Sequence, residues 1–161
     1  MSTAAANKDY DLDGESRDQS KDFLTIIIAE QRFGIPVLQV QDVLGEQIVT
    51  NIPLAPSEVA GSLNLRGRVV TAIDVRRRLG IDPSKDGEAT GMSVVVEHEN
   101  ELYSLIIDRV GDVLTLKDDM FENNPPTLDA IWREISGGIF RLEEELLVVL
   151  DVPKLLSTIH S

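Results

Sequence analysis

Short apolar runs separated by turn-forming residues dominate the chain from residue 23 onward. Their spacing predicts two β-hairpins, one over residues 23–37 and the other over residues 93–108. The runs are rich in Val, Ile and Leu, and aromatic residues make up only 4% of the chain, so the core must be mostly aliphatic. The pattern therefore predicts an all-β fold built from antiparallel hairpins.

The segment from Gly61 to Gly80 combines a predicted buried strand with a concentration of charge. It carries five of the fifteen basic residues of the chain. Val69–Ile73 is short, apolar and β-branched, which is typical of a buried strand, and Gly67 before it suits a turn. The Asp74 carboxylate is placed to cap a short helical turn, which we expect to end at Gly80.

The arginines of this segment fall into two groups. Arg76–Arg78 is expected to form an exposed helical turn whose charges complement the C-terminal end of the helix. Arg66 lies at the entry to the strand, where its planar guanidinium can bind a carboxylate or a carbonyl. The pattern leaves two roles open for Arg66, an internal brace or an anchor at an interface with a partner.

An internal repeat divides the chain. Val110–Leu114 matches Val40–Leu44 at four of five positions, with an offset of 70 residues. Leu147–Leu156 echoes Val70–Leu79 with an offset of 77 residues, and each of these pairs of windows follows a similar hairpin. A duplication explains why two matching windows recur in the same order along the chain. We therefore predict two small antiparallel barrels packed together through a shared apolar seam.

The duplication suggests boundaries within one double-barrel domain. We predict a disordered acidic tail over residues 1–22, because this stretch has hardly any apolar content. The first barrel is expected over residues 23–80 and a connecting loop over residues 81–91, which are rich in turn formers. The second barrel is expected over residues 92–161, with a helix near its C-terminal end.

Composition and charge restrict the possible functions. The net charge of −13 argues against binding to nucleic acid or to an anionic membrane across the whole surface. No apolar run approaches the ~18 residues of a membrane span, so we expect a cytoplasmic protein without membrane insertion. The chain has no cysteine, which excludes disulfides and thiol catalysis.

The residues that could carry chemistry lack the spacing that chemistry requires. His98 and His160 have no partners at metal-ligand or triad spacing. The spacing of Asp9, Asp11 and Asp13 matches the first positions of a calcium-binding loop. The twelfth position of such a loop requires a bidentate carboxylate, and here it is a serine. Asp74 and Asp151 repeat in capping positions and are expected to be structural. We therefore predict no catalytic residue, no metal site and no cofactor.

Several motifs resemble one known family. Asn64-Leu65-Arg66-Gly67, followed by Val69-Val70, Ile73-Asp74-Val75 and Arg76, resembles the signature of the CheW family of bacterial chemotaxis coupling proteins. Gly34-Ile35, Val40–Val43, Gly61 and Asp108-x-Val110-x-Asp112-Val113 also fall where that family has similar residues. The likeness covers residues 23–157. The chain departs from the family at Thr71-Ala72, near a position where the family usually has proline.

The resemblance implies two SH3-like five-stranded β-barrels and a non-enzymatic adaptor that is recruited from the cytoplasm to membrane-bound receptor arrays. Its implied partners are the tip of methyl-accepting chemotaxis receptors and the regulatory domain of the histidine kinase CheA. The implied receptor-binding residues are Val40, Asp42, Gly61, Asn64, Arg66, Gly67 and Val110, around a groove between the barrels. Val43 and Val113 are the implied kinase-binding residues. Two alternatives remain, the same fold serving another chemosensory or motility pathway, and a barrel that binds a small ligand in a deep polar pocket.

Overall fold

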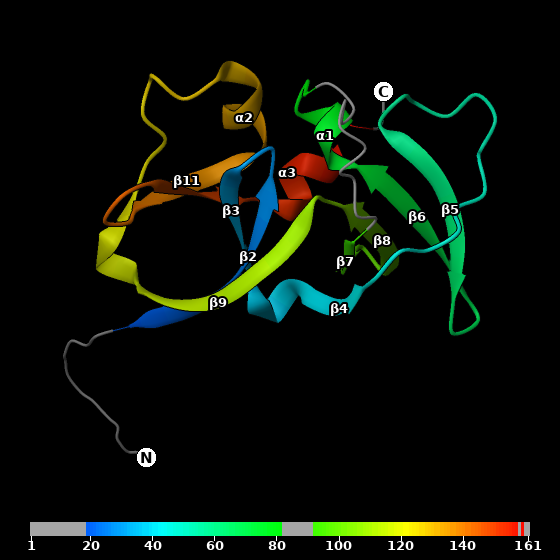
Figure 1. Cartoon of the computed structure of the whole chain (residues 1–161), viewed down its shortest axis with the longest axis horizontal. Coiled ribbons are helices and arrows are strands. Elements are labelled where there is room, and N and C mark those ends of the chain that lie inside the picture. The colour runs from blue at the N-terminus through cyan, green and yellow to red at the C-terminus, as the bar shows by residue number, and fades with distance from the viewer. Residues whose placement is uncertain (1–18, 82–91, 158, 160–161) are drawn as a thin grey trace, which may run out of the picture.

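The computed structural model describes residues 19–81, 92–157 and 159, which form two β-sheets with a few short helices (Figure 1). The elements, in chain order, are β2 (Ser20–Ile28), β3 (Gln31–Pro36), the 3-10 turn η1 (Val37–Gln39), β4 (Val40–Leu44), β5 (Val59–Leu65), β6 (Arg68–Asp74), α1 (Val75–Arg78), β7 (Ser93–His98), β8 (Glu101–Ile106), β9 (Arg109–Lys117), the 3-10 turn η2 (Asp118–Met120), β10 (Phe121–Glu122), α2 (Ala130–Ile135), β11 (Ser136–Arg141), β12 (Leu146–Leu150) and α3 (Val152–Ser157). The predicted all-β class is confirmed.

Tight two-residue turns connect the hairpins. Both central residues have positive φ at Ala29–Glu30 between β2 and β3, at Arg66–Gly67 between β5 and β6, and at Glu99–Asn100 between β7 and β8. This is the backbone of a type I′ turn, whose twist matches that of the flanking strands. The turn predicted at Gly67 is therefore confirmed, and it holds Arg66 in a left-handed conformation, with φ of 51°.

Each of the two sheets contains strands from both halves of the sequence. One sheet has the order β10-β11-β12-β3-β2-β9, and we call it the terminal barrel because it contains the first and the last strand of the described chain. The other has the order β4-β7-β8-β6-β5, and we call it the middle barrel. The hairpin of each half completes the barrel of the other half. The predicted division into barrels over residues 23–80 and 92–161 is therefore wrong, because the strand after each hairpin pairs with the other hairpin and not with its own.

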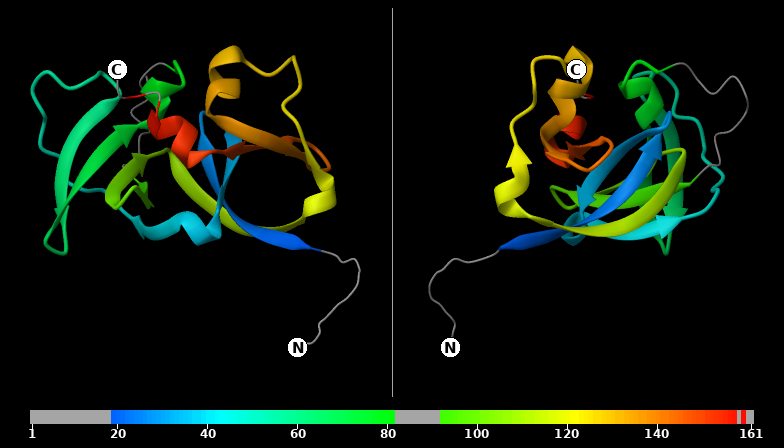
Figure 2. Two further views of the ribbon diagram at one scale, coloured as in Figure 1. Left: turned by 180° about the vertical axis from the view of Figure 1, so that it is seen from behind. Right: turned by 60° about the vertical axis from the view of Figure 1, so that its left-hand side comes forward.

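The exchange nevertheless preserves the duplication. In the terminal barrel Val110 pairs with Ile26 and Val113 with Leu24. In the middle barrel Val40 pairs with Val96 and Val43 with Val94. Corresponding residue numbers differ by 70 in both strands. The two barrels therefore have equivalent strand orders and equivalent registers, and they lie side by side in Figures 1 and 2.

Each sheet closes on itself in the same way. The chain leaves the edge strand β9, turns through η2 and pairs as β10 with β11 at the opposite edge. In the middle barrel the chain leaves β4 and returns at Thr50, which bridges to Ser62 of β5. Gly61 and Gly138 lie at bulges beside these closing segments, with φ of 151° and 150°. A Cβ at Gly61 would collide with the Thr50 carbonyl oxygen, so glycine is required there.

A shared apolar core joins the barrels, as the sequence predicted. It includes Phe33 and Ile35 of the terminal barrel together with Val94, Val96 and Leu105 of the middle barrel, all fully buried. Each barrel also has a smaller cluster of its own. The two barrels therefore pack as one body around a common seam.

Hydrogen-bonding caps lie at the ends of the short helices where the sequence predicted them. Asp74 accepts a hydrogen bond from the Arg77 amide, and Asp151 accepts one from the Lys154 amide at the equivalent place in α3. Helix α1 closes with bonds from the Gly80 amide to the Arg77 carbonyl and from Ile81 to Arg76, which is a Schellman motif. The predicted structural role of both aspartates is confirmed.

The start of the fold differs from the prediction. Strand β2 begins at Ser20, where the sequence analysis placed residues 20–22 in a disordered tail, because Ser20 and Lys21 pair with Lys117 and Leu116 of β9. Residues 1–18 of the predicted tail and residues 82–91 of the predicted connecting loop lie outside the described residues.

Candidate interaction surface

An exposed ion pair joins β4 to the turn between β5 and β6. Arg66 Nη2 lies 2.8 Å from Asp42 Oδ2, and the Arg66 side chain is 75% exposed. The turn that carries Arg66 is fixed by Asn64, whose side-chain oxygen accepts a hydrogen bond from the Gly67 amide at 3.0 Å. The Asp42 carboxylate also accepts a bond from the Val43 amide at 2.9 Å. The structure thus brings together Asp42, Asn64, Arg66 and Gly67.

This geometry combines the two roles that the sequence left open for Arg66. The pair with Asp42 braces the β5–β6 turn against β4. The guanidinium is nevertheless accessible to a partner, because most of its surface faces solvent. An exposed pair of this kind contributes little to folding stability, typically about 0–1 kcal/mol.

The predicted apolar contact residues occupy equivalent places on β4 and β9. Val40 and Val110 are partly buried against the shared core, one from each barrel. Val43 and Val113 point outward, with 39% and 55% of their surface exposed. Gly61 differs from the other predicted site residues because it is buried in β5, where it offers a backbone conformation and no exposed surface.

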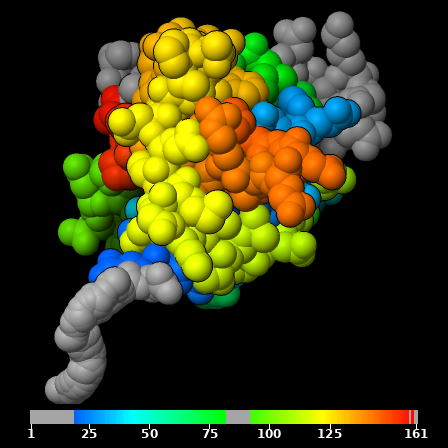
Figure 3. Space-filling model, turned by 90° about the vertical axis from the view of Figure 1, so that its left-hand side faces the viewer, coloured from blue at the N-terminus to red at the C-terminus, as the bar shows by residue number. Residues whose placement is uncertain are grey.

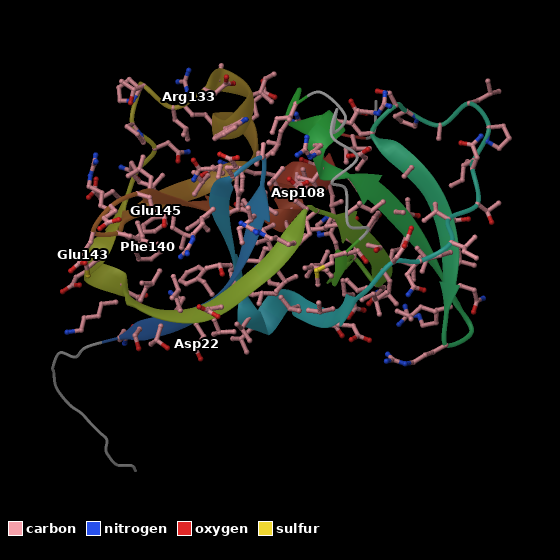
Figure 4. All side chains as sticks on the ribbon, in the orientation of Figure 1. Asp22, Asp108, Arg133, Phe140, Glu143 and Glu145 are labelled. Carbon is pink, nitrogen blue, oxygen red and sulfur yellow. The ribbon has the colours of Figure 1, made fainter. Side chains whose placement is uncertain are left out.

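The equivalent end of the terminal barrel carries the opposite charge. Glu143 and Glu144 form the turn between β11 and β12 at the positions equivalent to Arg66 and Gly67, and Glu145 follows. Asp112 occupies the position of Asp42. One barrel therefore ends in an arginine turn and the other in an acidic turn, marked by Glu143 and Glu145 in Figure 4.

A pocket of about 330 Å³ lies at the end of the terminal barrel. Its floor is aromatic, with the Phe140 ring packed edge-on against the rings of Phe23 and Phe121 at 5.2 and 5.4 Å. Lys21 and Asp118, an ion pair at 3.3 Å, lie at its rim. Figure 3 shows this end of the barrel, covered mostly by residues 109–146. The lining is predominantly apolar, unlike the polar pocket that a small-ligand barrel requires.

Two of the three clustered arginines do not form an exposed turn, and that prediction is wrong. Only Arg77 is exposed. Arg78 has a 9% exposed side chain, and its guanidinium lies 3.2 Å from Glu134 of α2. The Arg76 side chain, 18% exposed, forms two bonds of 2.7 Å to Asp108. Sequence spacing gave no signal for these pairs, because each joins segments far apart in the chain.

Asp108 is held in its charged form. Burial alone would raise the pKa of this carboxyl. The hydrogen bonds from Arg76 and from the Ala29 amide, with the charges of Arg76 and Arg109, outweigh burial and hold the pKa of Asp108 below its usual range. The carboxylate is a fixed structural charge between the barrels, and it is labelled in Figure 4.

Several exposed apolar side chains escaped sequence reasoning. Leu38 on η1 is 96% exposed, Ile48 and Leu54 in the loop before β5 are 93% and 104% exposed, and Val69 on β6 is 74% exposed. Leu38, Ile48 and Leu54 lie in turn-rich segments, where the sequence does not reveal which way a side chain faces. Val69 was expected in the buried strand Val69–Ile73, and this part of the prediction is wrong because Val69 lies on the outward face of β6.

Metal-binding clusters and membrane-spanning helices are two further kinds of functional feature. Within the described residues, no group of three or more His, Asp or Glu side chains is arranged to hold a metal ion. Among the helices of that part of the chain, none is long and apolar enough to cross a membrane.

Two equivalent barrels that share a core and present ion pairs and apolar side chains at their surface define an interaction module. The comparisons with known proteins agree. A family model described as the CheW-like domain matches residues 22–160. The chain therefore belongs to the CheW family, and it is a scaffolding adaptor of chemosensory signalling.

Individual relatives support this assignment. The chain is 31% identical over 147 residues to the chemotaxis protein CheW of Klebsiella aerogenes, covering 91% of this chain and 87% of the relative. It is 26% identical over 141 residues to a probable chemotaxis protein CheW of Rhizobium etli, covering 88% and 90%. The crystal structure of the scaffolding protein TtCheW from Thermoanaerobacter tengcongensis matches with a TM-score of 0.73 and 26% identity, covering 82% of this chain and 89% of that chain.

Proposed function

We propose that the chain couples the cytoplasmic tip of methyl-accepting chemotaxis receptors to the regulatory domain of the histidine kinase CheA. It acts by binding and catalyses no reaction, and it is recruited from the cytoplasm to membrane-bound receptor arrays. The observation that carries the proposal is the exposed Arg66–Asp42 pair, which lies in the segment with the strongest family resemblance.

The receptor surface is proposed around this pair. A receptor tip is a helical hairpin, and a helix docks on apolar positions with polar groups at the rim. Val40 and Val110 supply partly buried apolar surface from two barrels, while Arg66 supplies an accessible guanidinium. Arginine is enriched among residues that dominate binding energy, because its fork binds carboxylates bidentately.

The kinase surface is proposed at Val43 and Val113. Both are exposed, and they occupy equivalent places in the two barrels. The kinase's regulatory domain has the same fold in this proposal. Contacts between different ends of two such domains are heterologous, so adaptor and kinase domains can alternate in a ring when the rotation closes.

Substitution of Arg66 tests the receptor surface. Arg66→Glu places a second carboxylate beside Asp42, and we expect affinity for a receptor-tip fragment to fall roughly tenfold or more, as for a hot-spot residue. Isothermal titration measures the affinity, and circular dichroism checks that the fold survives.

A charge swap separates the anchor from the brace. In the double variant Asp42→Arg with Arg66→Asp the ion pair can re-form, while the charge presented to a partner is reversed. Binding that stays weak supports a direct receptor contact by Arg66. Full recovery of binding would show that the pair serves only as a brace, and normal binding by Arg66→Glu itself would contradict the proposed surface.

The kinase surface has its own test and a matched control. Val113→Glu is expected to weaken binding to the isolated CheA regulatory domain and to leave receptor-tip binding unchanged. Val69→Glu alters another exposed valine, on β6, opposite Asn64 of the proposed receptor surface, so it is a control for kinase binding alone. Its affinity for the kinase domain should stay within about twofold of that of the unmodified chain, since isolated surface substitutions rarely cost more than about 0.5 kcal/mol. Equal loss in both variants would contradict a specific kinase contact at Val113.

A further inference from the structure

The described chain passes between the barrels twice. It leaves the terminal barrel through η1, between β3 and β4, and it returns through Ile107 and Asp108, between β8 and β9. The two crossings are equivalent in the duplication, because Leu38 on η1 and Asp108 differ by 70 positions. Their surroundings are nevertheless very different.

At the returning crossing, Asp108 binds groups from both barrels. Arg76 comes from α1, which follows β6 of the middle barrel, and it bonds both carboxylate oxygens at 2.7 Å. Ala29 comes from the β2–β3 turn of the terminal barrel, and its amide donates to Oδ2 of Asp108 at 2.8 Å. The carboxylate and guanidinium are 17% and 18% exposed, so solvent screens the pair only weakly. We call this set of three residues the inter-barrel clip.

At the other crossing the described residues form no such set. The residues equivalent to Asp108, Ala29 and Arg76 are Leu38, Glu99 and Pro153. The leucine has no acceptor for a backbone amide, and it is 96% exposed. Of the two crossings, only the returning one therefore carries a polar clip. The Arg78–Glu134 ion pair also joins the barrels, through α1 and α2, but it lies outside both crossings.

We infer that the inter-barrel clip sets the relative orientation of the two barrels, which makes Arg76 and Asp108 positioning residues for partner binding. A bidentate guanidinium–carboxylate contact fixes an angle as well as a distance. Apolar packing alone is non-directional and leaves orientation less defined. The consequence for binding rests on the proposed function, in which Val40 and Val110 come from different barrels and meet one partner.

Spin labels measure the orientation directly, because the chain has no native cysteine. Glu97→Cys on β7 and Glu144→Cys on the β11–β12 turn place one exposed label in each barrel. Lys117→Cys with Glu144→Cys places both labels in the terminal barrel and serves as the internal reference. Pulsed electron paramagnetic resonance of the full chain then gives the distance distribution for each pair.

Asp108→Asn removes the charge while keeping the side-chain shape, and Arg76→Lys keeps the charge while removing the fork. In both variants the inter-barrel distribution is expected to broaden or shift, with the distribution inside the terminal barrel unchanged. Asp118→Asn is the matched control, because it breaks an ion pair within one barrel and should change neither distribution. An unchanged inter-barrel distribution in a folded variant would overturn the inference. Loss of the fold in both variants would also overturn it, since the clip would then hold the fold and not the orientation.

Binding of the receptor-tip fragment completes the experiment. The clip variants should bind it roughly fivefold more weakly or worse, the size of a typical coupling between separate sites. A changed distance distribution with normal binding by both the clip variants and Arg66→Glu would overturn the proposed receptor surface, while the role of the clip in setting the barrel orientation would stand. Normal binding by the clip variants with weakened binding by Arg66→Glu would overturn their role in partner binding.

Discussion

The two barrels have the same strand order but different interior side chains. Around the pocket of the terminal barrel lie three aromatic rings, including those of Phe23 and Phe140. At the equivalent positions the middle barrel has Ser93 and Leu63. Strand order, bulge glycines and helix caps are nevertheless the same in both. The comparison shows that one strand order, with the same bulges and caps, accommodates aromatic side chains in one barrel and smaller side chains at the equivalent positions of the other.

The largest expected effect concerns the bulge glycines that the barrels share. Gly61→Ala and Gly138→Ala should each lower the free energy of unfolding by about 3 kcal/mol or more, because both residues have φ near 150° and an added Cβ would collide with the closing segment. Urea denaturation followed by circular dichroism measures the loss.

Gly45→Ala is the matched control for these variants. An added Cβ there meets no atom within 4 Å, so stability should change by less than about 0.5 kcal/mol. Mild effects at Gly61 and Gly138, similar to that at Gly45, would show that the bulges do not define the barrel.

The next prediction concerns the returning crossing, where Asp108 binds Arg76 and the Ala29 amide. The pKa of Asp108 is lowered in the folded protein, so the unfolded chain binds more protons as the pH falls. The stability from this carboxylate is fully present above its unfolded pKa, about 3.9, and is lost as the pH falls through the folded value. Asp108→Asn should therefore flatten the decline of urea midpoints between pH 5 and pH 2.

Arg76→Gln removes the partner of that carboxylate and should flatten the same profile. Both variants should also be less stable than the parent at pH 7, because breaking a largely buried pair leaves a charged or polar group without its partner. A profile that parallels the parent's in both variants would contradict the assignment of acid sensitivity to the clip.

The smallest effect has the opposite sign and lies in the middle barrel. The Ser93 hydroxyl is buried and has no hydrogen-bond partner, at the position where the terminal barrel has Phe23. Ser93→Ala removes an unsatisfied polar group and should raise the free energy of unfolding by about 1 kcal/mol. Thermal unfolding measures this change, and a fall in the unfolding temperature would indicate that the hydroxyl is satisfied in solution.

Much of the candidate surface could be predicted from the sequence. The Asn64–Gly67 motif identified the turn and its arginine, and the structure adds the partner, Asp42, from a different strand. The prediction for Arg76 and Arg78 was wrong because their partners, like that of Arg66, come from distant parts of the chain. Their neighbours in sequence suggested a solvated turn, whereas their neighbours in space are Asp108 and Glu134. Helical position indicates which residues share a face, but it does not indicate what will pack against that face.

By itself, the sequence determined the strands, the hairpin turn at Gly67, the caps at Asp74 and Asp151, and the existence of two related barrels. These features depend on local periodicity, on backbone conformation and on side-chain hydrogen bonds within a few residues. Only the tertiary structure decided that the hairpins are exchanged between the halves and that one crossing is clipped. Two equivalent halves offer nearly equivalent strand edges, so the choice between them depends on how the connecting segments span the shared core, and a local pattern carries no information about that path.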